Sequence, residues 1–439
     1  MQSSGSWAFS FAVAEGEFVL NSKQLRVRDL FKGRRAVAHI EKLCELGDRF
    51  VGTPGDAAAI EYVMNDFAKF GLEVSLSPLR VPGFVDEGTS LSMGDRQFDA
   101  IPAYFAPSTP PGGVSAPVVY AGTGEPREYE GLDVTGRIVL IQERGLGYAR
   151  FWLGTFAAEA MRRGAVGMIV VHPMPWPYRM SMEAGNSVIE NRFLTEQLPA
   201  VCVSSVDGQE IMYNLGKGGS ATEATLLVQT RRGDVDSAFV VGRSPGSDPS
   251  LPGVLMEAHR DNGIAPGAND NGSGSGILLE LARVLSSMEH KRDLHFVSST
   301  AEEGVTQGAW TFVRDHKDGL IAQTRAMLNL DMVGVGGRLN LVEMGLWPDS
   351  DPIPHPEWLN VLLEEIAADF GYHLGRMTAE WGVAEEARYI AAGVPSAWFW
   401  KPDDPYYHSV YDTPDKIDGN ALKAVGDITG AAAIFLADE

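Results

Sequence analysis

Short apolar runs alternate with longer amphipathic segments from about residue 237 to the end of the chain. The runs with the length and composition of buried strands are 238–241, 254–256, 294–298, 327–330 and 397–400. The segments in which apolar residues recur with helical spacing are 276–288, 310–316, 356–370 and 421–436. Strands separated by helices predict an α/β fold, with a mostly parallel or mixed central sheet flanked by helices and ligands bound beyond the carboxyl ends of the strands.

The rest of the chain divides into three parts. Residues 1–24 show no assignable pattern and are expected to be an N-terminal extension. Residues 25–85 contain two helical patterns and a strand, and are expected to form one domain with residues 235–439. Short strands and Gly/Pro turns fill residues 86–234, which hold no cluster of metal-ligand residue types. We therefore predict that residues 86–234 are an inserted α+β domain that serves as a lid or wall.

Composition disfavours two classes of partner. The formal net charge of the 439 residues is −22 at pH 7, which disfavours nucleic acid because phosphate binding relies on clustered Lys and Arg. No apolar run approaches the roughly 18 residues of a membrane span, and no basic segment precedes the apolar stretch 7–13 as in a signal peptide. We therefore expect a cytoplasmic protein without nucleic-acid or membrane partners. Secretion after removal of a leader, and assembly into homo-oligomers, stay open.

Polar side chains with metal-binding chemistry occur where the predicted strands end. They are His259 and Asp270 in the loop after 254–256, Glu302 and Glu303 after 294–298, Asp331 after 327–330, and His408 in the loop after 397–400. Because the carboxyl ends of parallel strands meet at one edge of a sheet, five chain segments are expected to deliver these groups to one place. The glycines between His259 and Asp270 allow their loop to fold back tightly.

Two histidines and three carboxylates are enough to hold two zinc ions if one carboxylate bridges them. We assign Asp270 as the bridge. His259 and Asp331 then complete the first ion, and the second is completed by Glu303 and His408. The positive charge that remains favours a bound hydroxide, because coordination lowers the pKa of water from about 15.7 to about 7. Oxygen-rich sites of this kind also accept cobalt or manganese.

Three further residues have expected roles in catalysis. Glu302 cannot easily share the metal of its neighbour, because adjacent side chains diverge, so we expect it to be the general base that accepts a proton from water. Asp261, two residues after His259, is placed to hold the other nitrogen of that imidazole. Tyr407, next to His408, is a candidate hydrogen-bond donor to the developing oxyanion.

These motifs, in this order, resemble a family of dizinc peptidases that includes aminopeptidase Y, bacterial leucyl aminopeptidases and glutamate carboxypeptidase II. The matching segments are 259–261 (His-x-Asp), 267–274 (Gly-Ala-x-Asp-Asn-x-Ser-Gly), 302–304 (Glu-Glu-Gly), 329–334 (Asn-x-Asp-Met-Val-Gly) and 407–418 (from Tyr-His-Ser to Lys-Ile-Asp). The resemblance covers about residues 25–85 and 235–439. The segments 118–122, 132–141 and 163–169 are similar to the protease-associated domain that several members insert.

The resemblance implies a zinc-exopeptidase fold, the same zinc ligands and general base, and a cis peptide bond between Asp270 and Asn271. One stretch departs from the family. Where relatives commonly show Ser-Asp followed by an aromatic residue or His, this sequence has Trp-Gly-Val-Ala-Glu-Glu-Ala-Arg-Tyr at 381–389. The metal ligands are unaffected, but substrate specificity is not carried over from the relatives.

The residues and the resemblance together predict a zinc-dependent exopeptidase. We expect an aminopeptidase that hydrolyses N-terminal residues of peptides, because a free α-amine suits the acidic groups around Glu302. A carboxypeptidase, or an amidase acting on N-acyl amino acids or dipeptides, is the alternative within the same chemistry. A non-catalytic, receptor-like homologue is the alternative from another class; loss of ligands would mark it, and here all five ligands are present.

Overall fold

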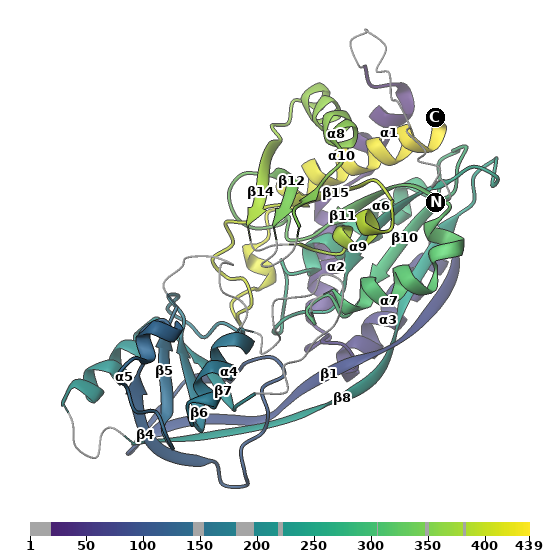
Figure 1. The fold of residues 1–439 in the computed structure, drawn as a ribbon. Helices are drawn as coiled ribbons and strands as arrows, with labels where there is room; N and C mark the ends of the chain where they lie inside the picture. Colours follow the sequence, from purple (N-terminus) through teal and green to yellow (C-terminus); the bar gives the residue numbers. More distant parts are fainter. Residues whose placement is uncertain are drawn as a thin grey trace, which may run out of the picture.

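The computed structural model describes residues 19–143, 153–180, 197–217, 223–304, 306–346, 351–380 and 383–439. We call residues 86–234 the insert and the rest of the chain the main domain. Figure 1 shows the insert at one end of the molecule, joined to the main domain by two long strands, β1 (Glu73–Met93) and β8 (Glu223–Ser244). Most of the expected N-terminal extension, residues 1–18, lies outside the described residues.

The main domain is built on a mixed sheet. Its strands, besides β1 and β8, are β9 (Gly253–His259), β10 (Leu294–Ser299), β11 (Thr324–Leu330), β12 (Asn340–Leu346), β13 (Ile353–Pro354), β14 (Gly375–Glu380) and β15 (Ser396–Trp400). Strands β10, β9, β11 and β15 lie side by side in that order and are parallel, whereas β8 and β12 pair antiparallel at either side. Every residue of β9 and β15 is buried, as expected for strands covered on both faces. The predicted α/β class is confirmed.

Helices cover both faces of this sheet (Figure 1). One face carries α1 (Ser22–Leu30), α2 (Gly33–Cys44), α3 (Pro54–Lys69), α6 (Gly272–Leu285), α8 (Glu357–Phe370) and α10 (Gly419–Asp438). The other face carries α7 (Gln307–Asp315) and α9 (Glu386–Ala391). Successive residues of β11 point to opposite faces, so Ala326 and Leu328 belong to the first core and Met327 to the second.

Helix α10 is long and apolar enough, by length and hydropathy, to cross a membrane, and 72% of that apolar window is buried inside the main domain. It packs against α1, α2, α6 and α8. A helix that is apolar on nearly all sides is expected to be surrounded in this way when it is a core element.

The glycine-rich start of α6 is explained by close packing on β11. A Cβ on Gly274 would collide with the carbonyl oxygen of Leu330. The side chain of Asn271 caps the helix, because its oxygen accepts from the N–H of Gly274 (2.8 Å) while its amide donates to the oxygen of Leu330 (2.8 Å). The start of α6 is thus fixed to the end of β11, which brings Asp270 next to Asp331.

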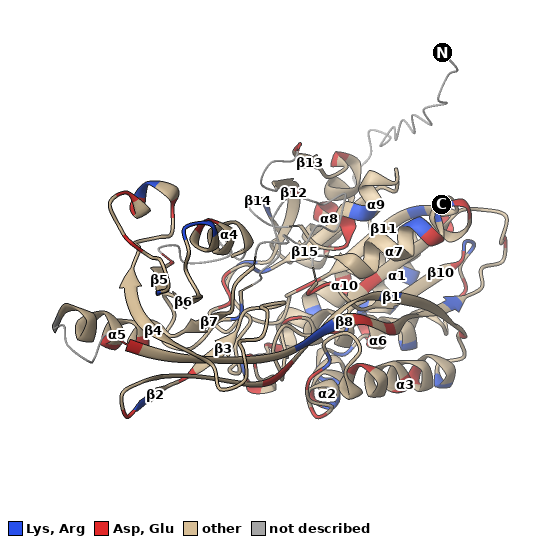
Figure 2. Cartoon of the chain, turned by 60° about the horizontal axis from the view of Figure 1, so that its bottom comes forward, with Lys and Arg blue, Asp and Glu red and all other residues tan. Residues whose placement is uncertain are grey.

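Strands β1 and β8 form one antiparallel ribbon, paired from Glu73 with Arg243 to Ser92 with Thr225. The sequence predicted separate short strands here, at 72–76, 225–229 and 238–241, because the residues between the last two are polar. Most of these residues are exposed, so the ribbon tolerates them, and Figure 2 shows basic and acidic residues along it. Cross-strand charges such as Arg80 and Asp236 (2.9 Å) lie side by side. The expected borders 85/86 and 234/235 fall within this ribbon, and the border at residue 24 falls within α1, so the division into domains stays a prediction.

The insert has a sheet of its own. Strands β4 (Val114–Tyr120), β5 (Ile138–Gln142), β6 (Gly167–Val171) and β7 (Ala200–Val203) are parallel, β3 (Ala100–Pro102) adds antiparallel to β7, and β2 (Arg96–Phe98) pairs with β1. Helices α4 (Gly154–Arg162) and α5 (Ser205–Lys217) accompany them. The insert docks on the main domain through aromatic rings, where Phe50 stacks on Tyr104 with centroids 5.3 Å apart.

Candidate metal centre

The five predicted metal ligands meet at the carboxyl ends of the parallel strands. His259 is the last residue of β9, Asp331 directly follows β11, and Asp270 directly precedes the cap of α6. Glu303 lies in the turn between β10 and α7, and His408 in the loop between β15 and α10. All five are buried. The prediction that distant segments deliver these groups to one edge of the sheet is confirmed.

Asp270 lies between the two histidines, with one carboxylate oxygen toward each. Its Oδ1 is 3.4 Å from Nε2 of His259, and its Oδ2 is 3.2 Å from Nε2 of His408. Each histidine also faces a second carboxylate: Nε2 of His259 is 3.3 Å from Oδ1 of Asp331, and Nε2 of His408 is 2.9 Å from Oε2 of Glu303. The arrangement is two sets of donors that share one carboxylate.

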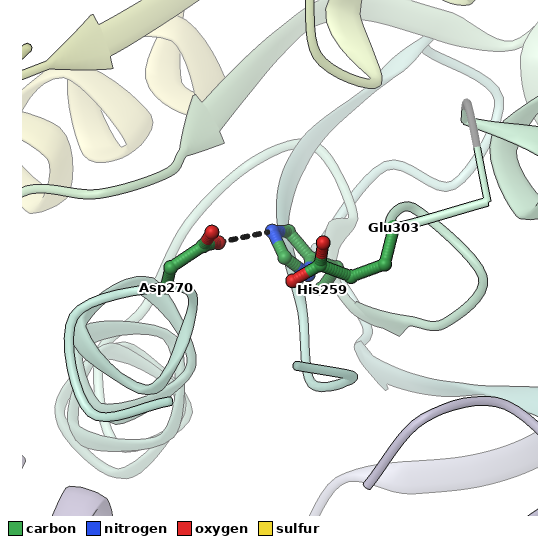
Figure 3. A group of neighbouring side chains, drawn as sticks. All are labelled: His259, Asp270 and Glu303. Atoms are coloured by element: carbon green, nitrogen blue, oxygen red, sulfur yellow. Dashed lines mark ion pairs between the residues drawn. The ribbon is translucent and has the colours of Figure 1, made fainter. Parts of the chain in front are cut away.

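The spacing of the donor atoms suits zinc. A tetrahedral ion with bonds of about 2.0–2.1 Å separates its ligand atoms by about 3.3–3.4 Å, which is close to the separations around Asp270. One donor atom each from His259, Asp270 and Glu303 lies within 4.8 Å of the other two. In Figure 3 the carboxylates of Asp270 and Glu303 both point toward the imidazole of His259. The residues present therefore fit a pair of divalent cations.

The pKa values of the cluster show how strongly its charges are coupled. Burial lowers the pKa of His408, but Glu303 and Asp270 outweigh it and raise this pKa to about 10. Burial raises the pKa of Glu303 to about 7, although His408 opposes the shift. Burial also raises the pKa of Asp331. Buried carboxylates that compete for protons in this way are stabilised when a cation takes the place of those protons.

Two further aspartates hold the ligands in position. Oδ1 of Asp261 lies 3.4 Å from Nδ1 of His259, and its Oδ2 accepts from the backbone N–H of Glu303 (3.2 Å). Asp261 therefore lies where the sequence analysis expected it. Asp412 accepts from the backbone N–H groups of Asn269 (2.8 Å) and Asp270 (3.0 Å) and was missed. Its place four residues after His408 was the only signal for it in the sequence.

Glu302 and Tyr407 border the ligand cluster. Burial raises the pKa of Glu302 well above its usual value, and His259, Glu385 and Asp331 are among the charges that act on it. As a whole residue Glu302 is half-buried, whereas Glu303 is buried. The ring of Tyr407 stacks on His408 with centroids 3.8 Å apart. Both side chains are therefore beside the ligands, and their chemical roles stay proposals.

Three residues among or beside the predicted ligands have backbone conformations that residues with a side chain rarely adopt. Ala301, Met332 and His408 have φ values of 61°, 53° and 50°, in the left-handed region. Such residues cost of order 1–3 kcal/mol each and persist where the surrounding structure holds them. The Asp270–Asn271 peptide bond is cis, as the family resemblance implied.

Glu385 is a buried acid behind the centre that the sequence analysis did not single out. Its carboxylate accepts from Oγ of Ser299 (3.0 Å) and from the side-chain amide of Asn329 (3.1 Å), so it joins the ends of β10 and β11. Burial raises its pKa to about 7, and Asp331 adds to the shift. It directly precedes the six-residue helix α9, which is too short to show helical periodicity. Trp381, at the start of the same unusual stretch, lies outside the described residues.

Arg49 is a fully buried cation that was not singled out from the sequence. Its guanidinium donates to the carbonyl oxygens of Arg260 (2.8 Å), Pro266 (2.8 Å) and Gly267 (2.9 Å). Its backbone N–H donates to the side chain of Asn262 (2.9 Å). Arg49 thereby fixes the loop that carries the chain from His259 to Asp270. In the sequence, the only sign of this role was an arginine next to apolar residues.

Comparison with protein families identifies both parts of the chain. Residues 240–433 match the model of peptidase family M28, and residues 114–211 match the PA domain. Residues 240–433 are thus similar to peptidase family M28. The chain is a metallopeptidase, a hydrolase whose substrates are peptides, with a PA domain inside the insert. The resemblance to this family and the inserted protease-associated domain are confirmed.

Individual proteins resemble the chain over most of its length. Aminopeptidase YwaD of Bacillus subtilis (strain 168) is 26% identical over 422 residues, which are 92% of this chain and 84% of the relative. Carboxypeptidase Q of Homo sapiens is 26% identical over 62% of this chain and 59% of its own length. The crystal structure of BSAP, a zinc aminopeptidase from Bacillus subtilis, has a TM-score of 0.74 at 24% identity and covers 93% of this chain and 98% of that chain. The last comparison supports the fold.

Proposed function

We propose that this metallopeptidase is a zinc-dependent aminopeptidase that removes N-terminal residues from peptides. The observation that carries the proposal is Asp270, whose two oxygens lie 3.4 and 3.2 Å from two imidazoles that each have a second carboxylate partner. The names of the relatives support the direction of cleavage, since YwaD is called an aminopeptidase and BSAP a zinc aminopeptidase.

In this proposal Asp270, His259 and Asp331 would hold one zinc ion, and Asp270, Glu303 and His408 would hold the other. When bound, such ions supply a Lewis acid and lower the pKa of water toward neutrality. Asp261 keeps the imidazole of His259 in one orientation, because its carboxylate lies 3.4 Å from Nδ1.

Glu302 is proposed as the general base. It borders His259 and Asp331 without being one of the proposed ligands, so its carboxylate is free to exchange a proton. Its raised pKa makes its carboxylate a stronger proton acceptor than an ordinary glutamate. The same residue then has a proton to return to the leaving amine. Tyr407, held against His408, is proposed as a hydrogen-bond donor to the carbonyl oxygen of the substrate.

The acidic surroundings favour a substrate with a free ammonium group. Glu302, Asp331 and Glu385 lie close enough to influence one another's pKa, so several acidic groups are concentrated beside the proposed ligands. An α-ammonium group is attracted to the ionised form of these acids, whereas a free α-carboxylate is repelled by it. The cytoplasmic location and the oligomeric state of the protein stay predictions.

A matched substrate panel tests the direction of cleavage. We expect a leucyl 4-nitroanilide with a free α-amine to be hydrolysed at least about 100-fold faster than its N-acetylated counterpart, because acetylation removes the charge that the acidic site attracts. A peptide amide should be cleaved as readily as the free acid. Faster turnover of the N-acylated compound would favour the amidase alternative. A requirement for a free C-terminal carboxylate would favour a carboxypeptidase, the activity named in one relative.

A further inference from the structure

His408 is held by the insert as well as by its own loop. The backbone N–H of Arg179 donates to the carbonyl oxygen of His408 (3.2 Å), and the carbonyl oxygen of Arg179 lies 3.2 Å from Nδ1 of the imidazole. A carbonyl oxygen at Nδ1 calls for a proton on that nitrogen, which leaves Nε2 to face Asp270 and Glu303. One residue of the insert therefore fixes both the backbone and the ring of a proposed ligand.

Rings of the insert also pack on the imidazole. Tyr178 stacks on His408 with centroids 5.5 Å apart and planes inclined by 28°. His172 stacks in turn on Tyr178, with centroids 4.1 Å apart and planes inclined by 7°. All three rings are buried. The hydrogen bond to Nδ1 orients the imidazole ring of His408, and the stacked rings limit its rotation.

The conformation of His408 needs this support. Its φ of 50° lies in the left-handed region, which is unfavourable for a residue with a side chain. Two hydrogen bonds connect this residue to Arg179, which belongs to the insert. A strained residue that is held from outside its own loop is expected to relax when the outside partner leaves.

The insert reaches this position from a distance. It is attached to the main domain by the ribbon of β1 and β8 (Figure 1). It docks through rings such as Tyr104, which stacks on Phe50 of the main domain. The segment with Tyr178 and Arg179 therefore lies against His408 only while the insert is docked. The sequence analysis gave the insert the passive role of a lid or wall.

We propose that the insert is a working part of the metal centre. The segment Tyr178–Arg179 positions the imidazole of His408, and undocking of the insert releases this ligand and so loosens one of the two metal ions. Tyr178 and Arg179 are positioning residues, since they act through His408. The inference rests on the proposed function, because it takes His408 as a ligand.

Zinc release separates this role from ordinary packing. Zinc-loaded protein is mixed with excess chelator, and the loss of both ions is followed with a zinc-sensitive dye while calorimetry gives the melting temperature. We expect Tyr178→Ala to release one ion about 10–100-fold faster and the other at the wild-type rate, as for loss of an outer partner of a metal ligand. Tyr178→Phe, which keeps the ring, should stay within about twofold of the wild type.

A control variant measures whether a general loss of stability in the insert is enough to change metal release. Ile211 is fully buried in α5, at the far end of the insert from the main domain (Figure 1). Ile211→Ala should lower the melting temperature and leave both release rates unchanged, because the cavity it creates is remote from His408. If Tyr178→Ala does not fold, His172→Ala removes the ring behind Tyr178 and should accelerate the same single phase.

Equal release rates in the wild type and Tyr178→Ala would overturn the proposal, as would an equal acceleration in Ile211→Ala. Neither result touches the proposed function, because the wild type would still hold two ions and cleave N-terminal residues. If the wild-type protein binds no zinc, that result would contradict the proposed function itself. The readout is metal release, so it does not depend on activity.

Discussion

Glu302→Gln is expected to lower kcat by about 10²–10⁴-fold, the usual contribution of a positioned general base. Glutamine has nearly the size of glutamate but cannot accept the proton of the attacking water. The position is half-buried and borders His259 and Asp331 without being one of the proposed ligands. Both metal ions should therefore stay bound, and the melting temperature should change little. Steady-state kinetics and metal analysis on the same preparation check the two halves of this expectation.

The adjacent residue provides the matched control. Glu303 lies 2.9 Å from Nε2 of His408 and is proposed as a ligand, so Glu303→Gln should lose activity together with one of the two ions. Identical substitutions at neighbouring positions would then separate proton transfer from metal binding. If Glu302→Gln keeps more than about a tenth of the wild-type kcat, another group serves as the base.

Asp270→Ala is expected to remove both metal ions and all measurable activity. The two oxygens of Asp270 face both histidines, so one substitution takes a ligand from each proposed ion. The loss of affinity should exceed the roughly 10–100-fold effect of removing an outer partner of a ligand. Competition of the apoprotein with a zinc chelator of known affinity measures it.

Asp403→Ala is the control for this substitution. Asp403 is an exposed aspartate five residues before His408, so its removal changes net charge in the same loop without touching a proposed ligand. It should bind zinc as the wild type does. Loss of only one ion in Asp270→Ala would show that Asp270 belongs to one site and does not bridge.

The edge of the sheet that carries the proposed ligands was predictable because these residues follow strands that are recognisable by themselves. β9, β11 and β15 are apolar and buried on both faces, so their limits are visible in the sequence. His259 and Asp331 end two of these strands. The parallel arrangement then determines which ends meet, and coordination chemistry selects the residue types.

The residues that were missed act through tertiary contacts. Arg49 and Asp412 bind backbone groups of the loop between His259 and Asp270, and no periodicity marks such contacts. Glu385 depends on a helix of six residues. The ribbon of β1 and β8 was divided because its middle is polar, although pairing supplies its hydrogen bonds whether or not it is buried.

The role of the insert could not be inferred from its own sequence for the same reason. Arg179 reaches His408 through backbone atoms, which any residue type would offer. Tyr178 and His172 were two aromatic residues among many in that segment. Their use is defined by docking on a loop more than two hundred residues later in the chain, and only the folded structure shows this docking.

The zinc content of the purified wild-type chain is the most direct measurement. After saturation with zinc and removal of loosely bound metal, mass spectrometry of the metal against protein concentration should give two ions per chain, and Asp270→Ala treated in parallel should give none. A wild-type content of zero or one, or two ions retained by the variant, would contradict a paired centre shared through Asp270.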